Sequence, residues 1–230
     1  MNISVLQTGP FGVNTYIVPL IKNKVLVFDP AACSFCGDEN AITDFLKENA
    51  LEPVAFLLTH GHFDHITGTA FLKSKFPLVP LAVNKEDTYI IGKNASKTQS
   101  KILFDMGLET LLNALSGLPD ADIVFCNDGT LDSFFKGISK EEVDALSAWT
   151  VIKTPGHTKG SVCYYNKSEK IIITGDTVFY KSWGRTDFPG GSEKEMMESL
   201  NKIYSTIPSD VLVYPGHDKF GFCLSENLKN

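Results

Sequence analysis

The chain has 230 residues, of which 43% are hydrophobic and 21% charged, and its formal net charge is −6. This composition is globular and excludes a disordered chain, which would carry more charge and fewer aromatic residues. The acidic balance argues against a nucleic-acid partner, because binding phosphates needs a basic face. No apolar stretch reaches the roughly 18 residues of a transmembrane helix, so no membrane partner is expected.

The N-terminus has no positively charged region and no long apolar run, so no signal peptide is predicted. The five cysteines are odd in number and scattered, which is typical of reduced thiols. Both features favour a cytoplasmic protein. Cys33 and Cys36 form an isolated C-x-x-C pair, which we interpret as two small apolar side chains in a loop, with a redox or metal role as the alternative.

In the first half of the chain, short apolar runs bounded by Gly, Pro or Asn predict strands. They lie at residues 3–6, 15–18, 25–28 and 54–58. Apolar residues at helical spacing predict an amphipathic helix over residues 38–49, and a second is expected from about 66 to 75. Similar spacing over residues 85–118 predicts helical cover with a break near Gly107, overhanging one side of the site.

The second half returns to predicted strands, at residues 151–153, 162–165, 171–174 and 211–214. A helix is expected over residues 193–204, with Ser192 as its N-cap. Strands followed by helices in both halves indicate a layered α/β fold with two packed sheets and helices outside. No Pro- or Gly-rich linker separates the halves, so we expect a single domain spanning residues 1–230.

The densest chemical signal is H-x-H-x-D-H at residues 60–65, directly after an apolar strand. Imidazole and carboxylate groups are natural ligands of zinc and related divalent ions. Three later strand ends each lead through a glycine to a further donor, and these donors are His157, Asp176 and His217. All five histidines of the chain therefore fall in three short segments, a pattern that five unrelated histidines would not produce.

The H-x-H-x-D-H segment, together with the three later donors, resembles the metallo-β-lactamase superfamily over nearly the whole chain. The resemblance implies a four-layer αββα sandwich with the site at one edge, between two β-sheets. It implies two divalent metal ions as cofactors, with zinc expected first and iron or manganese also suited to the ligands. The implied ligands are His60, His62 and His157 for one ion, Asp64, His65 and His217 for the other, and Asp176 bridging both.

Residues 175–179 and 183–191 are similar to those of glyoxalase II-like (hydroxyacylglutathione hydrolase-like) proteins, especially the short forms. Asp176 stands where the best-known zinc β-lactamases have a cysteine, which disfavours antibiotic hydrolysis. The resemblance implies hydrolysis of a small-molecule thioester by a hydroxide bridging the two ions, with Asp64 and Asp176 as catalytic residues. Asp176 would position the hydroxide and accept its proton.

Two alternatives stay open. Persulfide dioxygenases share the fold but use one iron held by two histidines and an aspartate, and residues 64–68 and 184–188 look similar to theirs. An RNA-processing nuclease of the same superfamily would use the same two-metal ligands, although the acidic balance disfavours it. The acyl group, the thiol carrier and the oligomeric state are not specified, and glutathione itself is in doubt, because full-length glyoxalase II binds it partly through a C-terminal helical region.

Two further residues attract attention beside these ligands. Arg185 is the sole arginine, and either forms a structural ion pair with Asp187 or meets an anionic substrate, the ion pair being favoured. Asp29 ends a predicted strand and is expected to orient the histidine segment, since metal-bound imidazoles usually donate their second N–H to a carboxylate or carbonyl.

Overall fold

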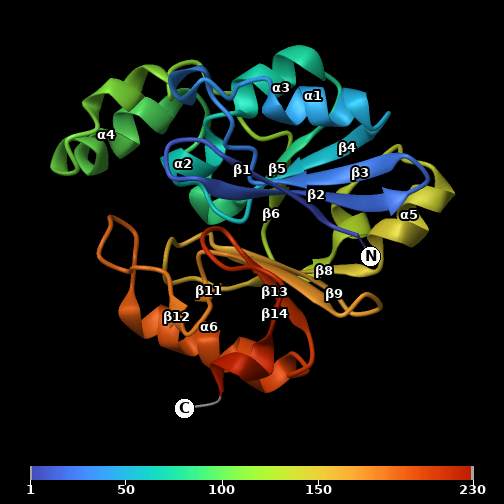
Figure 1. Ribbon diagram of the computed structural model, residues 1–230. Coiled ribbons are helices and arrows are strands. Elements are labelled where there is room, and N and C mark those ends of the chain that lie inside the picture. The colour runs from blue at the N-terminus through green and yellow to red at the C-terminus, as the bar shows by residue number, and fades with distance from the viewer. Residues whose placement is uncertain (1, 229–230) are drawn as a thin grey trace.

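A computed structural model describes residues 2–228 and contains two large β-sheets between outer helices (Figure 1). The first sheet has its strands in chain order: β1 (Ser4–Thr8), β2 (Val13–Ile21), β3 (Lys24–Phe28), β4 (Glu52–Leu57), β5 (Leu81–Asn84) and β6 (Ile123–Phe125). The strands pair antiparallel from β1 to β3 and parallel from β3 to β6. The parallel pairs need crossovers. These include η1 (Ser34–Cys36), α1 (Ala41–Glu48), α2 (Phe63–Ile66) and α3 (Thr69–Lys75).

The second sheet is built mostly from the C-terminal half of the chain. Its order is β14 (Phe222–Cys223), β13 (Leu212–Pro215), β10 (Ile171–Gly175), β9 (Val162–Asn166), β8 (Trp149–Lys153) and β7 (Gly129–Thr130). Its one parallel pair within the described residues, β10 with β13, is connected through α6 (Glu193–Thr206). A small ribbon of β11 (Val178–Phe179) and β12 (Ser182–Trp183) lies in the same connection.

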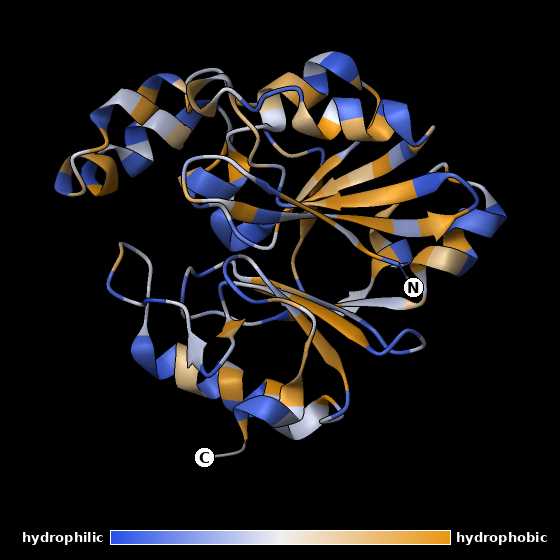
Figure 2. Ribbon diagram, viewed as in Figure 1, coloured by the Kyte–Doolittle hydropathy of each residue, from blue (hydrophilic) through white to orange (hydrophobic). Residues whose placement is uncertain are grey.

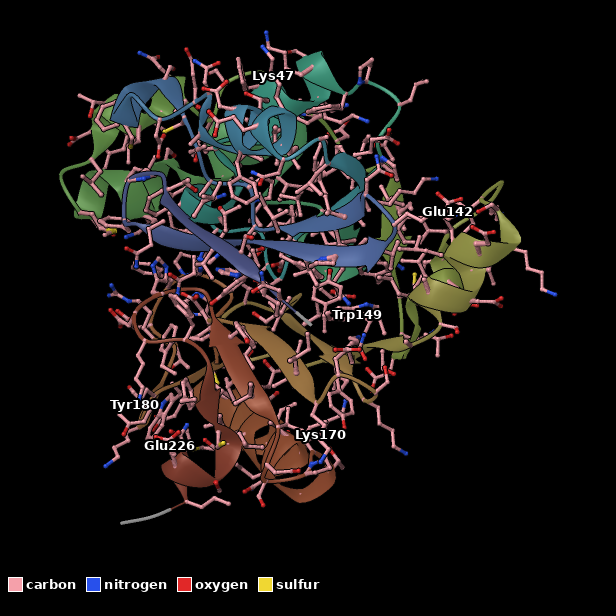
Figure 3. All side chains as sticks on the ribbon, turned by 45° about the vertical axis from the view of Figure 1, so that its right-hand side comes forward. Lys47, Glu142, Trp149, Lys170, Tyr180 and Glu226 are labelled. Atoms are coloured by element: carbon pink, nitrogen blue, oxygen red, sulfur yellow. The ribbon has the colours of Figure 1, made fainter. Side chains whose placement is uncertain are left out.

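Three apolar clusters separate four layers. Phe28 from the first sheet contacts Trp149 and Tyr164 from the second, with ring centroids 5.7 and 5.0 Å apart. Figure 3 labels Trp149 between the two layers of strands. The outer faces pack against helices, as Ile42 of α1 and Met196 of α6 show. The central strands are therefore apolar on both faces (Figure 2), and the predicted four-layer αββα fold is confirmed.

The segment between β5 and β6 is helical, as its apolar spacing predicted. It contains η2 (Lys85–Asp87), η3 (Gly92–Asn94), α4 (Ala95–Asp105) and η4 (Glu109–Asn113). The predicted break is at Gly107, whose φ of 70° is readily adopted by glycine. Figure 1 shows α4 projecting from one side of the molecule.

The remaining predicted elements agree with the structure in type and position, with ends that differ by up to three residues. The Ser192 side chain accepts a hydrogen bond from the backbone N–H of Glu195, which confirms the N-cap of α6. The helix expected from about residue 66 instead begins at Thr69, because Gly68 closes against the backbone of residues 30–32 and a Cβ there would lie 2.6 Å from the Pro30 carbonyl oxygen. Several elements were not predicted, among them β5, β6, β7, α5 (Lys140–Leu146) and the short η5 (Leu131–Phe134). A last turn, η6 (Leu224–Asn227), follows β14.

None of the helices formed by residues 2–228 combines the length and apolar character needed to cross a bilayer. All five cysteines are free thiols. Cys33 is buried, as a filling side chain should be, whereas Cys36 is exposed, so the interpretation of both as apolar fillers is wrong for Cys36.

Candidate metal centre

The seven predicted ligands come together where strands of both sheets end. The segment at residues 60–65 follows β4 of the first sheet, and His157 follows β8 of the second. Asp176 directly follows β10, and His217 comes soon after β13, the parallel neighbour of β10. Because neighbouring parallel strands end at the same edge of a sheet, these short loops converge on one point.

The first group of donors consists of His60, His62 and His157, whose nitrogens lie within 4.8 Å of one another. All three side chains are buried. His62 Nδ1 lies only 2.8 Å from His157 Nε2. The second nitrogen of His157, Nδ1, lies 2.7 Å from the carbonyl oxygen of Arg185 and so must be its N–H donor. The Nε2 atom of His157 therefore carries a lone pair, and this lone pair faces His62 Nδ1.

The second group consists of Asp64, His65 and His217, again within 4.8 Å of one another. His217 Nε2 lies 3.3 Å from Asp64 Oδ2 and 3.2 Å from His65 Nε2. The two residues from the histidine segment, Asp64 and His65, lie in α2. This group thus offers two imidazole nitrogens and one carboxylate.

Asp176 lies between the two groups. Its Oδ2 is 3.4 Å from His157 Nε2 and 3.7 Å from His217 Nε2. Its Oδ1 is 3.5 Å from His65 Nε2, and is buried with no hydrogen-bond partner among the described residues. A single carboxylate therefore reaches both sets of donors.

The protonation of the histidines differs across the site. Burial and the neighbouring imidazoles hold the pKa values of His60 and His62 well below their ordinary range, so both rings are neutral. Burial also lowers the pKa of His65, but the carboxylates of Asp64, Asp176 and Asp29 together outweigh it and raise the pKa to about 10. The carboxylates therefore make the second group favourable for a positive charge.

Asp29 forms the contacts expected of an orienting carboxylate. Its Oδ1 accepts the backbone N–H of Thr59 and its Oδ2 accepts the Thr59 hydroxyl, both at 2.7 Å. Its Oδ2 also lies 3.0 Å from His65 Nδ1. Because the Thr59 hydroxyl gives its hydrogen to Asp29, its oxygen accepts from His60 Nδ1 at 3.0 Å. These contacts engage the Nδ1 atoms of His60 and His65 and leave their Nε2 atoms for the two groups of donors.

Arg185 shapes a loop beside the site. Its guanidinium donates two hydrogen bonds of 2.7 Å to Asp187 and lies 3.8 Å from the ring centroid of Phe188. The expected ion pair with Asp187 is therefore present, and Arg185 also lines the pocket beside the donors. The backbone carbonyl of the same residue orients His157.

Sequence reasoning missed two buried residues beneath the histidine segment, Asp87 and Gln99. Asp87 accepts hydrogen bonds from both histidine-bearing loops. The Gln99 side chain accepts the N–H of Phe63 and donates to the carbonyls of Gly61 and Ile90. The available signal was an aspartate shortly after an apolar strand, the same pattern as Asp29, but that strand, β5, had not been predicted.

A pocket of about 230 Å³ opens onto the donors. Its apolar walls come from Phe11 of the β1–β2 turn, Phe63, Met106 at the end of α4, and Phe188. Phe11 and Phe63 pack edge to face with their ring centroids 5.7 Å apart. Met106 confirms that the helical segment overhangs one side of the site.

The donor set fits divalent metal ions. Buried polar atoms usually have hydrogen-bond partners, yet within residues 2–228 the Nε2 atoms of His60 and His62 have none. Neutral imidazoles and carboxylates converging in this way suit zinc, iron or manganese.

Comparison with known proteins agrees with the geometry. The family model described as the metallo-beta-lactamase superfamily matches residues 8–217. A probable metallo-hydrolase, YqgX of Bacillus subtilis, is 31% identical over 98% of this chain and 94% of its own length. The hydroxyacylglutathione hydrolase GloC of Haemophilus influenzae is 24% identical over 100% of this chain and 97% of its own. The crystal structure of the B3 metallo-beta-lactamase BLEG-1 aligns with a TM-score of 0.78 and 25% identity, covering 99% of this chain and 96% of that one.

Proposed function

Since this chain belongs to the metallo-beta-lactamase superfamily, whose fold implies a divalent metal site, we propose that it is a metal-dependent hydrolase that cleaves a small-molecule thioester. The observation that carries the proposal is the convergence of seven buried or partly buried donors at the mouth of one pocket. We assign His60, His62 and His157 to one ion, Asp64, His65 and His217 to a second, and Asp176 to both. The whole chain is proposed to form one domain.

Two divalent ions at this site would lower the pKa of a water molecule to about 7 and polarise a substrate carbonyl. Asp176 would orient the attacking water and accept its proton, since its Oδ1 is buried without another partner among residues 2–228. Asp64 would hold the second donor group in place through His217. A thiol with a pKa near 8.5 leaves readily as thiolate, so the reaction needs no dedicated general acid.

The pocket limits the size of the part of the substrate that reacts. Its volume of about 230 Å³ is below the ~300–1,000 Å³ of pockets that enclose drug-sized ligands. Its walls are largely aromatic, and the guanidinium of Arg185 is already engaged by Asp187. We therefore propose a small acyl group inside the pocket and a thiol carrier that extends outside it. The hydroxyacylglutathione hydrolase among the relatives supports this substrate class.

The test combines metal analysis with a substrate panel. Protein purified without chelator should contain about two metal ions per chain and turn over a hydroxyacylglutathione or a short-chain acyl thioester. Asp176→Asn should abolish turnover, whereas Asp210→Asn, which removes an exposed carboxylate paired with Lys170, should not. Equal activity in both variants would refute the site assignment.

Two other experimental outcomes would favour a different activity. The likeness to BLEG-1 calls for a β-lactam in the panel, and faster turnover of that β-lactam than of any thioester would favour an antibiotic-hydrolysing enzyme. A single iron per chain, with oxygen uptake in the presence of a persulfide, would favour the persulfide dioxygenase reading.

A further inference from the structure

Asp87 is a fully buried carboxylate held by three hydrogen bonds. Its Oδ2 accepts the backbone N–H of Gly61 at 2.8 Å and the Thr158 hydroxyl at 2.7 Å. Its Oδ1 accepts the backbone N–H of Gly160 at 2.8 Å. The relative exposure of Asp87 is 0%. All three donors are uncharged, so the carboxylate is buried against backbone and hydroxyl groups.

These three donors belong to the two loops that carry the first histidine group. Gly61 lies between His60 and His62, and Thr158 directly follows His157. The first loop follows a strand of the first sheet, and the second connects two strands of the other sheet. Asp87 thus joins two loops that extend from different sheets.

Gly61 and Gly160 show how closely the two loops pack against Asp87 and the turn that follows it. A Cβ at Gly160 would lie 2.5 Å from Cγ of Asp87 and 2.6 Å from its backbone nitrogen. A Cβ at Gly61 would lie 2.8 Å from Cγ1 of Ile90, in the turn that follows Asp87. The loop of Gly160 therefore approaches Asp87 at backbone distance, and the loop of Gly61 packs against the side chains of the turn that follows Asp87.

We infer that Asp87 is a positioning residue for the metal site formed by His60, His62 and His157. The inference rests on the proposed ligand assignment. Two carboxylate oxygens satisfy three donors here, whereas an asparagine would present one oxygen and one NH₂ group to them. One of the loops would then face a donor in place of an acceptor and would move, separating His157 from His60 and His62.

The experiment compares Asp87→Asn with Asp122→Asn. Asp122 is the control, because its carboxylate also accepts a backbone N–H group, from Leu81, but it belongs to none of the clusters of possible metal donors among the described residues. Each protein is loaded with Co²⁺, and metal loss and the visible spectrum are followed against chelator concentration. Mutation of positioning partners of this kind typically changes metal affinity about 10- to 100-fold. Asp87→Asn should therefore lose one ion per chain at a chelator concentration at least tenfold lower than the wild-type protein does.

A milder pair of variants keeps the test decisive if Asp87→Asn does not fold. Thr158→Val removes only the hydroxyl donor and should weaken the same ion, whereas Thr158→Ser should restore it. Equal cobalt retention in the wild type and in Asp87→Asn or Thr158→Val would overturn the inference while leaving the metal centre intact. A wild-type protein that binds no cobalt would overturn the ligand assignment, and the inference with it.

Discussion

Mutation of Arg185 and Asp187 can distinguish two roles of the Arg185 side chain, which either shapes its loop or binds an anionic substrate. In the structure the guanidinium is engaged by a carboxylate and by the ring of Phe188, while its own carbonyl accepts the N–H of His157. If the side chain only shapes the loop, replacing either member of the pair should have the same kind of effect. If it meets an anionic substrate, replacing Asp187 should release the cation and improve binding.

The expected stability change is small because the pair is exposed. The two side chains are 49% and 65% accessible, so the ion pair contributes only about 0.2–1 kcal/mol. The cation–π contact with Phe188 adds about 0.5–1 kcal/mol at an exposed site. Arg185→Ala should therefore cost about 1–2 kcal/mol, a fall in Tm of roughly 2–8 °C, and Asp187→Ala should cost less.

The decisive assay is steady-state thioester hydrolysis by the two variants, beside their thermal unfolding. We expect both variants to lower kcat through looser orientation of His157 and to leave KM unchanged. A higher KM in Arg185→Ala together with a lower KM in Asp187→Ala would refute this reasoning and place the guanidinium on the substrate.

Three further outcomes are expected. Asp29→Asn should lower the free energy of unfolding by about 1.5–3 kcal/mol in urea denaturation, because hydrogen bonds to a charged acceptor are lost in a buried site. Met106→Ala should widen the pocket and raise kcat/KM for longer acyl thioesters relative to acetyl in a competition assay. The hydrogen bond from Lys24 lowers the pKa of Glu142 from 4.5 to about 2, so this carboxylate stabilises the fold above pH 4.5 and loses that effect as the pH falls through 2. Unfolding measured against pH should therefore show the destabilisation caused by Glu142→Gln at pH 6 and not at pH 2.

The sequence predicted the parts of the fold that depend on local pattern. The central strands were found because they are continuous apolar runs, and α6 because its periodicity and N-cap coincide. The strands β5 and β6 have four and three residues, too short for a pattern to distinguish them from loops. The helix α5 was missed although Ser139 and Glu142 form a capping box, a signal that the sequence does contain.

The donors of the site could be predicted, whereas the groups that position them could not all be. Imidazoles and carboxylates at strand ends can be recognised as candidate metal ligands from residue type and spacing alone. The contacts of Asp87 join residues 26, 71 and 73 positions apart, and that pairing exists only in three dimensions. The single domain, the cytoplasmic location and the roles of the seven donors stay predictions.

The distribution of these groups has a consequence for how the centre assembles. Neither sheet supplies a complete set of donors, because the first sheet brings the segment at residues 60–65 and the second brings His157, Asp176 and His217. Two buried carboxylates fix the first segment from different sides, Asp29 from within its own sheet and Asp87 across to the loop of His157. Docking of the sheets through their shared apolar cluster therefore precedes a competent site. Metal ions that bind only the docked state must then stabilise the interface between the sheets as well as the ligands they touch.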